Sequence, residues 1–540
     1  MDPPFAITLD SGSSRANHTG SWRTERPEYV RNLPPCNGAC PAAEDIQGWL
    51  FHAESGDYEA AWRHIVADNP FPAVMGRVCY HPCETACNRG HLDEAVGINS
   101  VERFLGDLAI ERGWSIPVDA EPTGRRVLVV GAGPSGLSAA YHLRRLGHEV
   151  EVHDAAPAAG GMMRYGIPHY RLPRAVLDAE IARITSTGVV LVLGRPVTDV
   201  AAAMAAGRFD AAFMAVGAGV AKRAYVPAGA AARIIDAIGF LHGMEGEEPP
   251  RIGRRVVVYG GGDTAVDAAR TARRMGAEPV IVYRRTRDRM PAHDLDVEEA
   301  LEEGVLARWL STIRHVEAGE VTVERMELDE SGVPQPTGET ETLAADTVIL
   351  ALGQDCDLTL IEGVAGIEVA DGVVQVGPDM MTGHPGIFAG GDMVPAERTV
   401  TTAVGHGRLA ARNVDAWLRG AVHTPAPRPP EATFATLNTW YFEDAPRTVR
   451  PRLEAARRAS TFDEVVAGLD ETTALFEARR CLSCGNCFEC DNCYGVCPDN
   501  AVIKLGPGKG YRFDLDYCKG CGICVEECPC GAIEMGQEPV

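Results

Sequence analysis

Two stretches of the chain share one pattern of apolar and polar positions. Residues 125–154 begin with the apolar run VLVV, pass through a glycine-rich turn and a helical period, and end in alternating residues up to Asp154. Residues 254–285 repeat the pattern, from VVVY to Arg284 and Arg285. An apolar run, a turn, a 3.6-residue period and a second strand are typical of a βαβ unit. The middle of the chain is therefore predicted to hold two Rossmann-like α/β domains.

The first turn has the spacing of a dinucleotide site. Its predicted binding residues are Gly131, Gly133, Pro134, Ser135 and Gly136. Such glycines allow a tight turn and let a pyrophosphate approach the N-terminus of the following helix. Asp154, 23 residues after Gly131, is placed to accept a hydrogen bond from a ribose hydroxyl. The alternative is a purely structural βαβ turn, but strand, helix and terminal acid together favour a nucleotide.

The second turn predicts a different nucleotide. Its predicted binding residues are Gly260, Gly262, Asp263, Thr264 and Ala265, followed by Arg284, Arg285 and Arg289. Where the first unit ends in an acid, this one ends in arginines, and guanidinium groups suit a 2′-phosphate. The second site is therefore predicted to prefer NADPH. Arg287 also follows this strand. The alternative is that some of these four arginines form a solvated face and that only two of them contact the phosphate.

A third landmark is the segment IFAGGDMVPAERTVTTAVGHGRLAARN, which begins at Ile387. It resembles the closing FAD motif of the two-dinucleotide-domain flavoprotein reductases, which include thioredoxin reductase and glutathione reductase. The resemblance implies FAD at the first turn and an NADPH domain inserted between two halves of the FAD domain. It assigns flavin contacts to Gly391, Asp392, Thr401, Thr402 and Ala403. Only Cys356 lies in this middle region, and one thiol cannot form an intramolecular disulfide, so thiol reduction is disfavoured.

The cysteines are concentrated at the two ends of the chain. Of 17, five lie between Cys36 and Cys87 and eleven between Cys481 and Cys530. Two CxxCxxCxxxCP runs near the C-terminus match the bacterial ferredoxin pattern, in which the fourth cysteine of each run ligates the other cluster. Zinc would satisfy CxxC pairs but does not explain both runs. One predicted 4Fe-4S cluster takes Cys487, Cys490, Cys493 and Cys528; the other takes Cys518, Cys521, Cys524 and Cys497.

Residues 30–425 resemble the small subunit of bacterial glutamate synthase and the N-terminal half of dihydropyrimidine dehydrogenase. The motifs that carry this resemblance are CP at Cys40, GRVC and CETACNRG, GAGPSGL, GGMMRYGIPHYRLP, GGGDTAVDAAR, VYRRTRDRMPA and AGGD. The resemblance implies a helical domain with two 4Fe-4S clusters next to FAD, and it places Gly161 beside the flavin. An additional CxxC expected before Cys36 is absent. One N-terminal cluster is therefore predicted, on Cys40, Cys79, Cys83 and Cys87, with Cys36 a leftover thiol or an outer ligand.

These three clusters use twelve cysteines and leave Cys36, Cys356, Cys481, Cys484 and Cys530. The pair Cys481 and Cys484 is compatible with an additional site or with another register of the first ferredoxin run. An unligated or zinc-bound pair is favoured over an additional iron cluster.

The predicted architecture is multidomain. A helical iron-sulfur domain spans 1–120, the FAD domain 121–226 and 356–425, the NADPH domain 227–355, a linker with helical segments 426–480, and an α+β ferredoxin-like domain 481–540.

The hydropathy and charge of the chain exclude some classes of function and partner. No run of 18 apolar residues occurs, and the net charge of −24 argues against nucleic acid as a partner. Because the first thirty residues lack the pattern of a secretory signal, we expect the protein to be located in a reducing cytoplasm. The tail from Cys481 carries nine acids against four bases, which favours a basic docking face on its partner. It resembles the delta subunit of 2-oxoacid:ferredoxin oxidoreductases, which implies such a complex, or ferredoxin, as partner.

The predicted function is an NADPH-dependent oxidoreductase subunit that moves electrons between NADPH, FAD, the clusters and a partner enzyme. A flavin is needed because hydride carries two electrons and clusters take one. The rivals are a glutamate synthase small subunit, a stand-alone ferredoxin:NADP reductase, and a noncatalytic scaffold.

Overall fold

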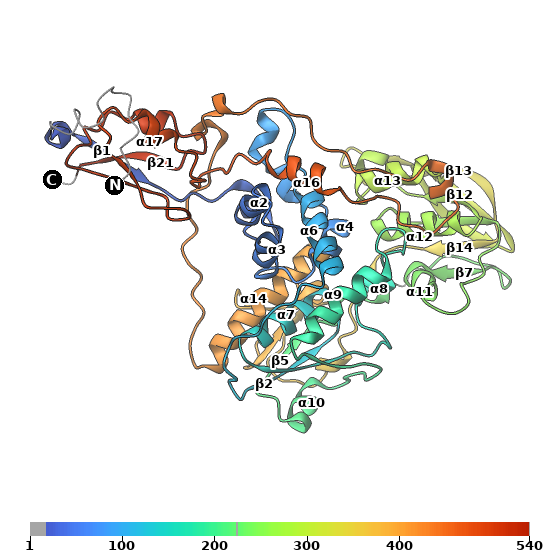
Figure 1. Ribbon diagram of the computed structural model, residues 1–540. Helices are drawn as coiled ribbons and strands as arrows, with labels where there is room; N and C mark the ends of the chain where they lie inside the picture. Colours follow the sequence, from blue (N-terminus) through green and yellow to red (C-terminus); the bar gives the residue numbers. More distant parts are fainter. Residues whose placement is uncertain (1–17, 223–224, 539–540) are drawn as a thin grey trace.

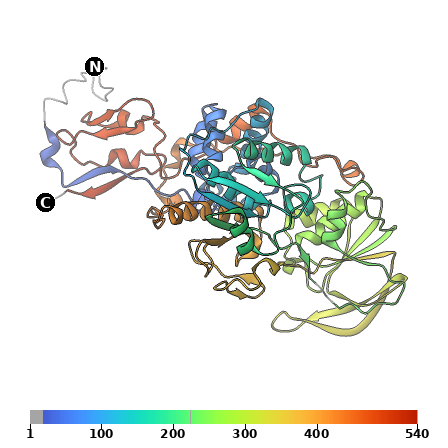
Figure 2. The same cartoon turned by 90° about the horizontal axis from the view of Figure 1, so that it is seen from below.

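The computed structural model describes residues 18–222 and 225–538. The ferredoxin-like tail and the second α/β domain lie at opposite ends of the molecule, with the helical region and the first α/β domain between them (Figures 1 and 2). No helix among the described residues is long and apolar enough to cross a membrane.

The first α/β domain is built on a five-stranded parallel sheet in the order β18-β5-β2-β3-β4. Its strands are β2 (Arg126–Val130), β3 (Glu149–His153), β4 (Val190–Val192), β5 (Ala211–Met214) and β18 (Ile387–Ala389). Helices α7 (Pro134–Arg145) and α14 (Val400–Leu418) pack against each other beside it (Figure 1). Since β18 comes from far downstream, residues between β5 and β18 leave this sheet and return to it.

The intervening residues form a second parallel sheet in the order β10-β9-β8-β14-β7. Its strands are β7 (Ile234–Asp236), β8 (Arg255–Tyr259), β9 (Glu278–Val282), β10 (Leu306–Arg308) and β14 (Thr347–Leu350). Its helices are α11 (Ala237–Gly243), α12 (Asp263–Arg274) and α13 (Asp294–Glu302). The chain crosses between the two domains through the antiparallel pair β6 (Val220–Ala221) and β15 (Gln354–Asp355).

An antiparallel sheet was not foreseen from the sequence. Its strands are β11 (Ser311–Glu317), β12 (Gly319–Leu328) and β13 (Pro334–Ala345). The smaller elements of the two α/β domains are α8 (Met162–Tyr165), α9 (Arg174–Ser186), α10 (Val200–Gly207), β16 (Val369–Ala370) and β17 (Val373–Val374).

The helical region packs around buried Trp49 and Leu50. Its helices are α1 (Pro35–Ala39), α2 (Ile46–Glu54), α3 (Tyr58–Val66), α4 (Pro72–Val78), α5 (Pro82–Thr85) and α6 (Ile98–Arg112). The side chains of Asp45 and Asp57 cap α2 and α3 by accepting backbone N–H bonds. A Cβ on Gly106 of α6 would lie 2.3 Å from the nitrogen of Ala73 in α4, so glycine lets these helices approach closely.

The tail joins both ends of the chain. Its elements are α17 (Asn492–Val496), β19 (Val502–Lys504), β20 (Tyr511–Phe513), α18 (Ile523–Glu526) and β21 (Ile533–Gln537). Strand β21 pairs antiparallel with β1 (Glu25–Tyr29), which the sequence assigned to the helical domain. The predicted boundary at residue 120 therefore groups β1 with the wrong unit, because the short, polar ERPEY segment carries no strand signal of its own.

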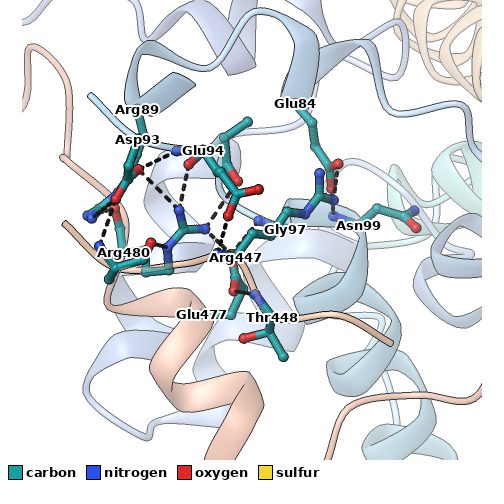
Figure 3. A network of polar contacts seen from close by, with 12 residues as sticks. Glu84, Arg89, Asp93, Glu94, Gly97, Asn99, Arg447, Thr448, Glu477 and Arg480 are labelled. Atoms are coloured by element: carbon teal, nitrogen blue, oxygen red, sulfur yellow. Dashed lines mark hydrogen bonds and ion pairs between the residues drawn. The ribbon is translucent and has the colours of Figure 1, made fainter. Parts of the chain in front are cut away.

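Residues 426–480 are mostly without regular secondary structure and contain α15 (Ala455–Arg458) and α16 (Glu471–Ala478). Helix α16 packs on α2 and α6. At its end Arg480 is 2% exposed; its guanidinium donates to Glu477 (2.6 Å), to Asp93 (3.2 Å) and to the carbonyls of Glu94 and Ala95 (Figure 3). Glu477 also accepts from the backbone nitrogens of Gly97 and Thr448. This buried network fixes the segment before the tail to the helical region.

Replacing Arg480 with methionine is expected to lower the free energy of unfolding by about 3–5 kcal/mol, because it leaves the buried Glu477 carboxylate unpaired. Urea unfolding followed by circular dichroism measures this change. The control is Arg479→Met one residue earlier, where the side chain is exposed and a change within about 0.5 kcal/mol is expected. Equal effects of the two substitutions would contradict the assigned role of the network.

Candidate dinucleotide and iron-sulfur sites

One cavity of about 1430 Å³ spans the two α/β domains and contains both glycine turns in its wall. From the first turn it is lined by Gly131, Gly133, Pro134 and Ser135, and from the second by Gly260, Gly262, Asp263 and Thr264. The remaining predicted members, Gly136 and Ala265, are buried and do not line it. The structure thus brings the two predicted nucleotide sites to a single cavity.

At two positions of the first turn there is no space for a Cβ atom, which explains why glycine occurs there. Gly131 has φ +107°, and a Cβ there would lie 2.3 Å from the carbonyl oxygen of Ala215. A Cβ on Gly136 would lie 1.9 Å from the carbonyl oxygen of Gly131. Gly133 lies against Gly161, since a Cβ on Gly161 would come within 2.7 Å of the Cα of Gly133. The buried hydroxyl of Ser135 has no hydrogen-bond partner. A turn at a helix N-terminus with an unpartnered hydroxyl fits a bound pyrophosphate.

The acid at the end of β3 also lies at this cavity. Asp154 accepts hydrogen bonds from the backbone nitrogens of Ala132 (2.6 Å) and Ala156 (2.7 Å), which hold its carboxylate at the cavity wall. This position fits recognition of a ribose hydroxyl, as predicted.

The arginines after β9 divide into two groups. Arg284 and Arg285 line the cavity, and the buried Nε of Arg285 has no partner. Arg287 pairs with Glu298 at the surface (3.2 Å), and the guanidinium of Arg289 lies beside Gly332. Two guanidinium groups are therefore available to a phosphate in the cavity, while the structure does not bring predicted Arg289 to it.

The GGD segment lies across from the first turn. Gly391 has φ +72° and lies against Ser135, and Asp392 lines the cavity, where burial raises the pKa of its carboxyl. Thr399 caps α14 by accepting from the nitrogen of Thr402 (3.1 Å). Of the predicted flavin contacts on α14, only Ala403 lines the dinucleotide cavity.

Thr401 instead lines a second, smaller cavity, here called the Cys79 cavity. Its thiols are those of Cys40, Cys79 and Cys83, and it also contains the buried carboxyl groups of Glu44 and Glu102. Asn69 donates to both carboxyls, at 2.9 and 3.1 Å, and burial raises their pKa, that of Glu44 to about 7. These two acids were not identified from the sequence, since their role depends on which helices meet.

The wall between the two cavities is thin. Val78 and Tyr80 line the dinucleotide cavity, while Cys79 between them lines the Cys79 cavity. On α14, Val400 and Ala403 face the first cavity and Thr401 the second. A group held by Cys79 is therefore separated from the dinucleotide cavity by a single layer of chain.

The fourth predicted N-terminal ligand lies elsewhere. Cys87 lines a third cavity, here called the Cys481 cavity, together with Cys36, Cys481 and Cys484. Burial and the neighbouring thiols of Cys481, Cys87 and Cys484 raise the pKa of Cys36. The structure thus separates Cys87 from Cys40, Cys79 and Cys83, with which the sequence had grouped it.

The tail cysteines gather as the ferredoxin pattern predicts. Burial and the nearby thiols of Cys487, Cys490 and Cys528 raise the pKa of Cys493 to about 12.

The cysteines predicted to bind the second tail cluster also lie close together. The pKa of Cys524 is raised to about 12 by burial and by thiols that include Cys518, Cys497 and Cys521. The fourth cysteine of each run therefore lies among the first three of the other. No three His, Cys, Asp or Glu side chains among the described residues are close enough to hold a single metal ion.

The GGMMRYGIPHYRLP segment joins the two α/β domains. Tyr170 is buried beneath Arg274 of the second domain (3.6 Å to the ring centroid), and His169 pairs with Glu245 (2.6 Å). Arg171 pairs with Asp267 (2.9 Å) and lines the dinucleotide cavity, as does Gly161. His169 and Tyr170 therefore pack between domains.

Comparison with known proteins identifies the family. Residues 125–407 match the family model of pyridine nucleotide-disulphide oxidoreductases. The chain belongs to this family. In this pyridine nucleotide-disulphide oxidoreductase, residues 29–114 also match dihydropyrimidine dehydrogenase domain II, 4Fe-4S cluster, and residues 486–532 match a 4Fe-4S dicluster domain. The predicted flavin and iron-sulfur oxidoreductase is thereby confirmed.

Curated relatives of this oxidoreductase include subunits of redox enzymes. The NADP(+)-dependent formate dehydrogenase subunit beta of Moorella thermoacetica is 36% identical, over 83% of this chain and 70% of the relative. The NADPH-Fe(3+) oxidoreductase subunit beta of Geobacter sulfurreducens is 33% identical, over 83% and 75%. The glutamate synthase [NADPH] small chain of Escherichia coli is 32% identical, over 71% and 89%, which confirms the resemblance found in the sequence.

Proposed function

We propose that the chain is the NADPH-binding subunit of a redox complex, with FAD at the Gly131 turn and NADPH at the Gly260 turn. Asp154 and Asp392 would hold the ribose and ribityl hydroxyls of FAD, and Arg284 and Arg285 the 2′-phosphate of NADPH. Bound FAD would supply the conversion between hydride and single electrons. The unpartnered Ser135 hydroxyl and Arg285 Nε support these assignments.

The observation that carries the proposal is the wall between the cavities. Because Cys79 lies between two residues of the dinucleotide cavity, a 4Fe-4S cluster on Cys40, Cys79 and Cys83 would be next to the flavin. Glu102, buried in the same cavity, is the candidate for the fourth ligand. The two tail clusters would use the eight cysteines that the ferredoxin pattern assigns.

The partner is proposed to dock on the tail. The relatives from Moorella and Geobacter are both named as beta subunits, and each is matched over most of this chain. The acidic tail fits a basic docking face, and its ferredoxin-like clusters suit an iron-sulfur partner such as a 2-oxoacid:ferredoxin oxidoreductase. A glutamate synthase small subunit is the second candidate, on the 32% identity to the Escherichia coli chain.

Anaerobic purification with mass spectrometry of bound proteins tests the subunit proposal. We expect an iron-sulfur oxidoreductase subunit to copurify, and to be released by high salt because surface charge attraction is screened. Isolation of the 540-residue chain alone, combined with rapid reduction of free ferredoxin, would favour a stand-alone reductase instead. Copurification of a glutamine-hydrolysing large subunit would favour the second candidate.

A further inference from the structure

The Cys481 cavity gathers four thiols from three distant segments of the chain. Cys36 belongs to α1, Cys87 follows α5, and Cys481 and Cys484 follow α16. The rest of its wall is largely apolar and includes Pro35, Leu50, Val96 and Ile98. Its volume, about 20 Å³, equals that of the Cys79 cavity. Four convergent thiols in an apolar pocket match the ligand set of a 4Fe-4S cluster.

We propose that Cys36, Cys87, Cys481 and Cys484 hold a fourth 4Fe-4S cluster, built from both ends of the chain. This site takes three thiols that the ferredoxin pattern leaves over, and it explains why Cys87 lies apart from Cys40, Cys79 and Cys83. This cluster would add one centre to the electron route of the proposed function, on which that role rests. The presence of the cluster does not depend on NADPH being the electron donor.

A hydrogen bond to one of the thiols supports a cluster. The backbone nitrogen of Ser483 donates to the sulfur of Cys481 (3.4 Å). N–H donors to cysteine sulfur are among the features that tune iron-sulfur clusters. All four cysteines are free thiols, so none of them is committed to a disulfide.

The polar network of Figure 3 holds the two halves of the site together. Arg89, two residues after Cys87, donates to the carbonyl oxygen of Arg480 (2.8 Å), one residue before Cys481. Arg480 in turn donates to the carbonyls of Glu94 and Ala95, in the loop that follows Cys87. Because both guanidinium groups are nearly fully buried, these bonds fix the Cys481 segment against the Cys87 segment.

The position of the site connects the other clusters. Cys36 and Cys40 lie one helical turn apart on and just after α1, a rise of about 6 Å. Cys484 precedes Cys487 by three residues, which places their Cα atoms at most about 11 Å apart. A cluster on these cysteines would therefore lie close both to the Cys79 cavity and to the thiols of the first tail cluster.

Iron and acid-labile sulfide analysis of the anaerobically purified full chain tests the proposal. At four irons per cluster, we expect about 16 irons per chain in the unaltered protein and about 12 in a Cys481→Ala/Cys484→Ala variant. The matched control is Cys356→Ala, which removes a thiol that is assigned to no cluster and is expected to leave about 16 irons.

Three results would contradict the proposed cluster. The first is about 12 irons in the unaltered chain, and the second is an unchanged iron content in the double variant. The third is about one zinc per unaltered chain that is absent from the double variant. If the double variant does not fold, the iron count of the unaltered chain and that of Cys36→Ala decide the question. Failure of the proposed function would give a different result. A chain with its full iron content that does not oxidise NADPH would support the fourth cluster and would exclude only NADPH as the electron donor.

Discussion

A Cys79→Ala variant is expected to keep NADPH-dependent bleaching of the flavin but to lose electron delivery from NADPH to an acceptor at the tail. Cys79 is a proposed ligand of the cluster next to the dinucleotide cavity, and it lies between Val78 and Tyr80, which line that cavity. Because loss of even an outer-shell partner commonly lowers activity at metal sites by about 10–100-fold, removal of a ligand is expected to cost about 100-fold or more. Anaerobic stopped-flow spectroscopy separates flavin bleaching from reduction of a viologen acceptor.

The control for this variant is Cys356→Ala. The sulfur of Cys356 donates to the backbone of Asp392 (3.5 Å) and is not assigned to any cluster. Acceptor reduction at the unaltered rate is expected. Loss of acceptor reduction in Cys356→Ala but not in Cys79→Ala would indicate thiol chemistry beside the flavin and would contradict the cluster route.

An Arg284→Ala/Arg285→Ala variant is expected to raise the KM for NADPH by about 100-fold or more while leaving the KM for NADH nearly unchanged. Each hydrogen bond to a charged group contributes about 1.5–3 kcal/mol, a factor of about 10–100 per arginine. Only NADPH carries the 2′-phosphate that these guanidinium groups would bind. Steady-state kinetics with both nucleotides measures the difference.

Arg287→Ala is the matched control for the two arginines. Its side chain pairs with Glu298 at the surface and lies outside the cavity, so the KM for either nucleotide is expected to stay the same. An equal rise in both KM values in the double variant would mean that the arginines stabilise the domain rather than select the phosphate.

Local patterns in the sequence predicted the parts of the site that depend on one short segment. Gly131 and Gly133 of the first turn, the acid at Asp154 and the arginines at Arg284 and Arg285 line the dinucleotide cavity. Each follows from strand and turn geometry within about 30 residues, the length of a βαβ unit. The crossed arrangement of the tail thiols was predictable for the same reason, because the spacing CxxCxxCxxxCP defines it.

The remaining assignments depend on contacts between distant segments. Spacing alone cannot tell which cavity a helical cysteine faces, so Cys87 was grouped with Cys40 although the fold places it with Cys481, 394 residues later. The same limit applies to Thr401, which lines the Cys79 cavity, whereas Ala403, two residues later, lines the dinucleotide cavity. Strand β1 pairs with β21 across the whole length of the chain, and nothing in ERPEY indicates its partner.

The central claim is that electrons on thiol-bound clusters at both ends of the chain reach the dinucleotide cavity. The most direct test is to reduce the anaerobic protein fully with dithionite, remove the excess, and count the NADP⁺ that it converts to NADPH. Two electrons from the flavin and one from each of four clusters predict about three NADPH per chain. A yield of about one NADPH, the amount that flavin alone supplies, would contradict the account.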